Sequence, residues 1–258
     1  MTTYSEDFQG GATTANTLLT LTPTAGWQVP PGNFVIYQAD VGLAGIVDAK
    51  ECAGALVIQV SGQGGGTWAF AIGGGVGATT AGNAKQADPV EMSIPVKGGQ
   101  VVIVKIITAE VSNDERVGLR YMEGNGQTCM TLHCGGAGQD STAGTELLLT
   151  VDSKLDPVNM TPWRDARIKE IRFTGSGIIA ALAAATRLRV SVPGLADVFK
   201  FVVRSGNSGA TTSAQEETTV IKHLDIPVKN GQTVSVRILT TATTGQAILS
   251  AGCTLVCY

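Results

Sequence analysis

The stretch that decides the fold is Ile94-Pro-Val-Lys-Gly-Gly-Gln100, which returns 132 positions later as Ile226-Pro-Val-Lys-Asn-Gly-Gln232. The same offset joins Gly77-Ala-Thr-Thr80 to Gly209-Ala-Thr-Thr212. Between Leu56 and Glu110 roughly a third of the positions are identical at this offset without a gap, as an internal repeat requires. The sequence therefore predicts one domain built twice.

A second match outlines the edges of the two copies. Thr131-Leu-His-Cys134 resembles Thr254-Leu-Val-Cys257, which predicts that these are the last strands of the two copies. The run GGAGQDSTAG at 135–144 follows the first of them and has the Gly/Ser/Thr composition of a flexible linker. We therefore expect two domains, residues 1–138 and residues 139–258.

Each copy has the pattern of short β-strands. Runs rich in Val, Ile, Thr and Leu are separated by Gly, Pro or Asn, and alternating apolar positions are shared between the copies. The shared positions, which we expect to be buried, include Val102, Val104 and Ile106 with their counterparts Val234, Val236 and Ile238. The predicted strands of the first copy are Leu18–Thr22, Phe34–Val41, Ala55–Val60, Trp68–Ile72, Glu91–Val96, Val101–Ile107, Val117–Met122 and Cys129–Cys134.

This strand pattern predicts the fold class. About eight strands in ~120 residues fit an all-β fold of two tandem antiparallel β-sandwich (jelly-roll) domains that arose by internal duplication. An immunoglobulin-like sandwich with seven strands is the alternative. Helical patterning is weak, with short helices expected only at Ile46–Ala53 and Ile178–Thr186.

Composition and charge limit the classes of partner. Hydrophobic residues make up 43% of the chain and charged residues 15%, against a typical ~25% charged. A low fraction of charged residues indicates that much of the protein's surface is covered by other molecules when it functions. Residues 1–140 carry 6 Lys+Arg and 12 Asp+Glu, a net charge of −6, and residues 141–258 carry 12 and 9, a net charge of +3. Opposite charges favour contact between halves, and neither half is basic enough to indicate nucleic-acid contact.

The ends and apolar runs predict where the chain is made. The first residues, MTTYSED, are polar and acidic, unlike a secretory leader. The longest small apolar run, GIIAALAAA at 177–185, is far shorter than the ~18 residues of a spanning helix. We therefore expect no transmembrane segment and folding in a cytoplasm.

The sequence offers little that indicates catalysis. His133 and His223 do not correspond between the copies, and no H-x-H, G-x-S-x-G, H-E-x-x-H or Walker A pattern occurs. We therefore expect a protein that is not an enzyme, with no catalytic residues, no cofactor and no metal. The five cysteines are predicted to be small core residues: Cys52, Cys129, Cys134, Cys253 and Cys257.

The tryptophans raise the alternative of carbohydrate binding, because sandwich lectins use exposed aromatic rings. Trp27 and Trp163 lie near the equivalent residues Pro30 and Pro162, after the first strand of each copy. Their recurrence near one shared turn favours a common packing role.

One difference between the copies predicts an interface. Apolar residues of the first copy correspond, at the offset of 132, to basic residues of the second. These positions are Val35, Tyr37, Val57, Trp68 and Ile72, opposite Arg167, Lys169, Arg189, Lys200 and Arg204. If they point outward, the first copy has an apolar outer face that packs on the second copy or on a neighbouring subunit. Sliding the Trp68 strand by one position pairs it instead with Phe199 and places its alternate residues in the core.

Taken together, the duplication, the short turns and the low charge make this chain resemble viral capsid proteins that have two jelly rolls in one chain. The resemblance implies a structural subunit of a virus or phage capsid. It implies association with itself into trimers and a shell, contact with other capsid proteins, assembly in the host cytoplasm, and a place in the virion. The compact loops depart from that family and keep two alternatives open: a phage decoration or spike protein, and a tandem glycan-binding β-sandwich module.

Overall fold

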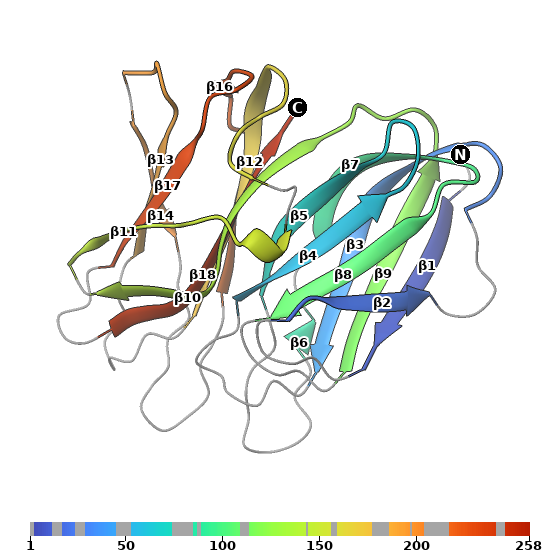
Figure 1. Cartoon of the computed structure of the whole chain (residues 1–258), viewed down its shortest axis with the longest axis horizontal. Helices are drawn as coiled ribbons and strands as arrows, with labels where there is room; N and C mark the ends of the chain where they lie inside the picture. The colour runs from blue at the N-terminus through green and yellow to red at the C-terminus, as the bar shows by residue number, and fades with distance from the viewer. Residues whose placement is uncertain are drawn as a thin grey trace.

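The chain is all-β in its computed structural model (Figure 1). The structure describes residues 3–11, 17–23, 29–44, 53–73, 85–86, 89–108, 114–142, 144–155, 159–176, 186–196, 198–203, 217–240 and 246–258. Every strand pairing in these ranges is antiparallel, and the arrangement is consistent with jelly-roll β-sandwiches, which confirms the predicted fold class. Within the same ranges no helix is long and apolar enough to cross a membrane.

Nine strands form what we call the first unit, drawn blue to green in Figure 1. They are β1 (Thr3–Gly10), β2 (Leu19–Pro23), β3 (Asn33–Ala44), β4 (Ala53–Val60), β5 (Gly66–Gly73), β6 (Lys85–Gln86), β7 (Val90–Lys97), β8 (Val102–Thr108) and β9 (Asp114–Glu123). Their order is β5-β4-β8-β2-β1-β9-β3-β6, with β7 also on β3. Because β2 pairs with both β8 and β1, it joins two layers into a nearly closed barrel.

The remaining strands form the second unit. They are β10 (Met130–Thr142), β11 (Glu146–Leu148), β12 (Ala166–Ser176), β13 (Thr186–Ser191), β14 (Val198–Val203), β15 (Glu217–Ile221), β16 (Ile226–Val228), β17 (Ser235–Thr240) and β18 (Gln246–Cys257). One sheet has the order β10-β18-β12-β15, with β16 also on β12, and the other has the order β11-β17-β13-β14. A short 3-10 turn, Ser153–Leu155, lies between the two units (Figure 1).

The same order of strands recurs in both units. The series β1-β9-β3-β7 corresponds to β10-β18-β12-β16, and β2-β8-β4-β5 corresponds to β11-β17-β13-β14. This corrects one sequence match, since β10 and β18 are neighbours in one sheet, with Leu132 opposite Leu255. They are therefore not the last strands of two copies, and β10 takes the place of β1. The boundary between residues 138 and 139 stays a prediction, and β10 runs across it.

The repeated stretch builds the same turn in both units. Gly99 has φ +83° and Gly231 has φ +77°, a conformation that favours glycine. The Gln100 side chain accepts a hydrogen bond from Lys97 N (2.7 Å) and donates one to Ser61 O (2.8 Å). Gln232 does the same with Lys229 N (3.1 Å) and Pro193 O (3.0 Å). The recurring glutamine thus ties each turn to a neighbouring loop.

Each unit encloses its own apolar core. Alternate residues of the strands point inward, as the shared positions predict: Leu56, Ile58, Val104 and Ile106 in the first core, Leu188, Val190, Val236 and Ile238 in the second. The four cysteines that are described, Cys129, Cys134, Cys253 and Cys257, are buried and free, as expected of small core residues. Cys52 and the two predicted helices, Ile46–Ala53 and Ile178–Thr186, fall outside the described residues, apart from one strand residue at the end of each helix.

Candidate assembly faces

The two units meet along a buried face that we call the seam. The outer surface of β4 and β5 contributes Ala55, Val57 and Ala69, which form a small apolar cluster with Leu155 of the 3-10 turn. Facing them is the outer surface of β10, β18 and β12 (Figure 1). A Cβ atom placed on Gly252 of β18 would lie 3.6 Å from the Ala71 Cβ atom, so the strands approach closely here. The outer apolar surface of the first unit is therefore covered by the second unit.

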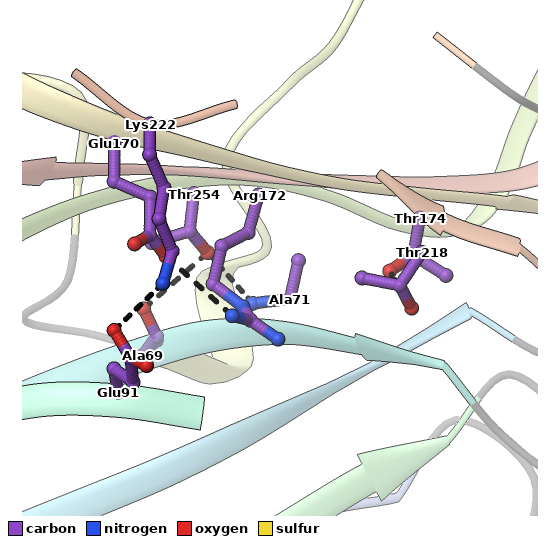
Figure 2. A network of polar contacts seen from close by, with 9 residues as sticks. All are labelled: Ala69, Ala71, Glu91, Glu170, Arg172, Thr174, Thr218, Lys222 and Thr254. Carbon is purple, nitrogen blue, oxygen red and sulfur yellow. Dashed lines mark hydrogen bonds and ion pairs between the residues drawn. The ribbon is translucent and has the colours of Figure 1, made fainter. Parts of the chain in front are cut away.

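Threonine hydroxyls satisfy the free edge of β5 at the seam. Among the described strands β5 pairs with β4 alone, so its other edge has backbone groups without a strand partner there. Ala69 N donates to Thr131 Oγ1 (3.0 Å), and Ala71 N donates to Thr254 Oγ1 (2.7 Å). The Thr254 hydroxyl in turn donates to Ala69 O (3.4 Å). Figure 2 shows Thr254 directed at this edge, which is thereby closed to other strands.

A buried arginine also belongs to the seam. Arg172 of β12 is only 2% exposed, and its Nη1 atom lies 3.5 Å from Glu170 Oε1 (Figure 2). Burial raises the pKa of Glu170, while Arg172 and Lys222 act to lower it. Lys222 Nζ also contacts Glu91 Oε2 of the first unit at 2.7 Å, at the exposed rim. A buried charge such as that of Arg172 is tolerated only when it has partners, so we expect the seam to depend on the pair of Arg172 and Glu170.

His133 of β10 is enclosed in the seam as a neutral side chain. Its Nδ1 atom is 2.8 Å from Thr254 Oγ1, and the residue is 2% exposed. Burial lowers the pKa of His133 to about 4, although the nearby Asp152 carboxylate acts in the opposite direction. The seam therefore holds a group that resists protonation in the folded state.

We expect acid to weaken the folded state through His133. Below its ordinary pKa of 6.5 the unfolded chain binds a proton that the folded chain does not bind until about pH 4. Stability from this group is therefore lost as pH falls from 6.5 to 4, by about 2–3 kcal/mol. Urea unfolding of wild type and His133→Gln at pH 7, 6, 5 and 4 measures the difference.

The comparison with His133→Gln is needed because Glu6 changes the stability of the folded state in the opposite direction as the pH falls. Burial, with help from Asp7, raises the pKa of Glu6 to about 7, so this group favours folding as pH falls from 7 to 4.5. Both proteins share Glu6, and its effect cancels in the difference between them. Equal pH dependence of the two proteins would contradict the role given to His133.

A second outer face is not covered by any of the residues that the structure describes. The outer surface of β11-β17-β13-β14, which we call the basic face, corresponds to the covered surface of β4 and β5. Arg189 lies directly opposite Arg237 on one side and Lys200 on the other, and like charges so placed destabilise a sheet. Glu146 contacts Arg189 (3.1 Å) and Arg237 (3.8 Å). The basic face consists of Glu146, Leu148, Arg187, Arg189, Lys200, Val202 and Arg237.

Exposed apolar side chains add to the basic face. Val202 is 75% exposed and Leu148 is 41% exposed, each beside basic residues. At the matching pairs the covered surface has Val57 opposite Ala69, where the basic face has Arg189 opposite Lys200. Arginine is enriched at protein interfaces. The two faces thus occupy equivalent places with different chemistry.

The predicted interface residues of the first unit have three different fates. Trp68 and Ile72 point into the first core, so the expectation that they lie on an outer face is wrong. Trp68 Nε1 donates to Cys129 O (2.7 Å), and Phe199 and Phe201 pack on the second core, so the strand register is the one slid by a single position. Val57 is covered at the seam.

Val35 and Tyr37 lie on β3, away from the basic face. Val35 is buried, and a Cβ atom on Gly126 would come within 2.7 Å of it, so the backbone at Gly126 lies against this side chain. Tyr37 is half-buried and lines a hollow of about 380 Å³ at the seam together with Lys169 and Tyr258. Neither residue offers an exposed apolar surface.

The basic residues of the prediction are divided between two places. Arg167 and Lys169 contact Asp225 on the second unit, each at 2.5 Å. Arg189 and Lys200 belong to the basic face, which the structure brings together with Arg187 and Arg237. Arg187 and Arg237 were missed, although their alternation with Leu188 and Val236 could have identified them. Arg204 lies outside the described residues.

Trp163 differs from the packing role expected of it. It is 64% exposed, and the Arg164 guanidinium carbon lies 5.0 Å from the centre of its ring. Trp27 lies outside the described residues. The expectation of a packed Trp163 is therefore wrong, because its ring stands at the surface beside a hollow of about 500 Å³.

Comparison with known proteins gives no family. No protein-family model matches the sequence, and no curated protein matches it. Among solved structures, a mutant VP2 protein of infectious bursal disease virus in T=1 particles is 11% identical, with a TM-score of 0.28 over 99% of this chain and 69% of that chain. The Gx strain of that virus gives 10% identity, a TM-score of 0.28, and coverage of 99% and 71%.

A plant storage protein, the vicilin from Solanum melongena, is 8% identical, with a TM-score of 0.17 over 92% of this chain and 74% of that chain. Identities and TM-scores this low establish neither a shared fold nor a shared function.

Proposed function

We propose that the chain is a non-enzymatic structural subunit of a virus or phage capsid that associates with itself into trimers and a larger shell. The observation that carries the proposal is the contrast between two equivalent faces. The surface of β4 and β5 is buried on the second unit, while the basic face is uncovered within the described part of the chain. The two units are repeats, and this face of the first unit is covered. We infer that the equivalent face of the second unit is covered as well, by another molecule.

The proposed cover is the first unit of another copy. Residues 1–123, which hold the strands of the first unit, carry 6 Lys+Arg and 11 Asp+Glu, a net charge of −5 that complements the basic face. Contact between different faces of identical chains is head-to-tail, and such contacts close into rings when the rotation allows. A trimer of two-unit chains is the ring we propose, and the low charged fraction of 15% fits a surface that neighbours cover.

Charge reversal on the basic face tests this proposal. The variant Arg187→Glu with Lys200→Glu is expected to weaken association by at least about 100-fold, because carboxylates then face an acidic partner. Lys200→Glu places a carboxylate opposite Arg189, so the fold itself keeps its stability. Analytical ultracentrifugation over a range of concentrations measures the association.

The matched control is Lys97→Glu with Lys229→Glu, which makes the same change in charge at exposed turn residues away from the basic face. We expect this control to associate like the wild type. Equal association of wild type and the basic-face variant would overturn the proposed contact, provided that both unfold at the same urea concentration.

A further inference from the structure

A hollow beside Trp163 lies apart from the basic face, and its lining shares no residue with the apolar cluster of Ala55, Val57, Ala69 and Leu155. It has a volume of about 500 Å³, within the ~300–1,000 Å³ typical of small-molecule sites. Three segments line it: the turn and strand start at 64–68, the entry to β10 at 128–132, and the loop at 159–163. Both units therefore contribute to what we call the Trp163 hollow.

The exposed indole gives the hollow an aromatic platform. Trp163 is 64% exposed and lines the hollow, so its ring is accessible to a ligand there. Arg164 stacks on the ring at 5.0 Å and donates from Nη2 to Thr128 O. Because the guanidinium is fixed at both ends, it holds the indole in one orientation.

The polar side chains that line the hollow itself are uncharged and fixed in place, while the Arg164 cation lies against the ring outside this lining. Asn159 Oδ1 accepts a hydrogen bond from Thr161 N (2.8 Å), and the Thr161 hydroxyl is 2.9 Å from that of Thr233. Thr67, Thr128 and Thr131 complete the polar part of the lining, and no described residue that lines the hollow carries a charge. This set of groups matches neither a metal ion nor a polyanion.

One rim of the hollow is bare backbone. A Cβ atom on Gly65 would lie 2.1 Å from Val60 O, and Gly64 has φ +78°, so both positions require glycine. The turn therefore lines this rim of the hollow with backbone alone at these two positions.

We propose that the Trp163 hollow binds a neutral carbohydrate, with one face of a pyranose ring on the indole of Trp163. The C–H groups of a sugar face are apolar and suit an aromatic surface, while its hydroxyls suit the Thr and Asn side chains. The absence of charge in the described lining favours a neutral sugar over a sialylated or sulfated one. This inference does not depend on the proposed assembly.

Saturation-transfer NMR on the full chain tests the proposal. The probes are maltose, cellobiose, lactose and N,N′-diacetylchitobiose, with 3′-sialyllactose and a heparin disaccharide as charged comparisons. We expect saturation transfer to at least one neutral disaccharide, and its affinity to fall by at least about tenfold in Trp163→Ala. The control variant is Val101→Ala, another exposed apolar position that lies outside both the Trp163 hollow and the basic face, and it is expected to bind like the wild type.

Three outcomes would overturn the assignment. These are no transfer to any neutral probe, transfer that survives Trp163→Ala, and stronger transfer to the charged probes than to the neutral ones. Because Trp163 is exposed, its replacement leaves the urea midpoint unchanged, and an unchanged midpoint shows that loss of binding is local. Failure here leaves the result of the charge-reversal experiment unaffected.

Discussion

Replacing Trp68 with alanine is expected to lower the free energy of unfolding by about 3–5 kcal/mol, the usual cost of removing a large buried aromatic side chain. Trp68 is 5% exposed within the first core, and its Nε1 atom donates to Cys129 O at 2.7 Å. The substitution leaves both a cavity and a buried carbonyl without its donor. Urea denaturation followed by circular dichroism measures the loss.

The matched control is Trp163→Ala, which removes the same side chain from an exposed position. We expect that variant to change the free energy of unfolding by no more than about 0.5 kcal/mol. A loss below about 1 kcal/mol in Trp68→Ala would contradict its place in the core and would return Trp68 to an outer face.

Removing Arg172 is expected to be about as costly, because it leaves the buried Glu170 carboxylate without its main cation. Loss of one partner of a buried pair typically costs about 3–5 kcal/mol. Without Arg172 the pKa of Glu170 is expected to rise further, since burial already raises it and Arg172 opposes that rise. Urea denaturation of Arg172→Ala at pH 7 measures the effect on stability.

The double variant Arg172→Met with Glu170→Gln separates charge from packing. It removes both charges and keeps the volume, so we expect it to be much closer to wild type than Arg172→Ala is. If the single and double variants lose the same stability, the electrostatic account of the seam is wrong.

Much of the fold could be predicted from the sequence because alternation and the repeated turn are local signals. The runs around Leu56 and Val104 alternate between apolar and variable positions, and each became a strand with the shared residues inside. Strand β1 was missed, because its inward positions include Glu6 between Tyr4 and Phe8, which breaks the apolar pattern.

The pairing of strands across the repeat could not be predicted. Thr131–Cys134 resembles Thr254–Cys257, and similarity alone does not tell whether two segments are equivalent strands or neighbours. Only the hydrogen-bonded order shows that β10 opens the second unit. The register of β5 could not be predicted from a fixed offset between the copies either, because a slip of one residue exchanges the two faces of a strand.

The interface residues were predicted in part for the same reason. A comparison of sequence positions identified Val57, Arg189 and Lys200 as outer-face residues, and each lies on an outer face. It did not reveal that the seam covers Val57, since burial between units depends on how they pack. Trp163 was assigned to packing because its position near Pro162 is shared, and position near a turn does not determine exposure.

The mass of the purified wild-type chain in solution tests the central claim most directly. Light scattering over a range of concentrations, with negative-stain imaging of the same samples, is the measurement. Self-assembly predicts particles of three times the 26.5 kDa chain mass, or larger closed shells, that become more abundant as concentration rises. A monomer of 26.5 kDa at every concentration would contradict the proposed function.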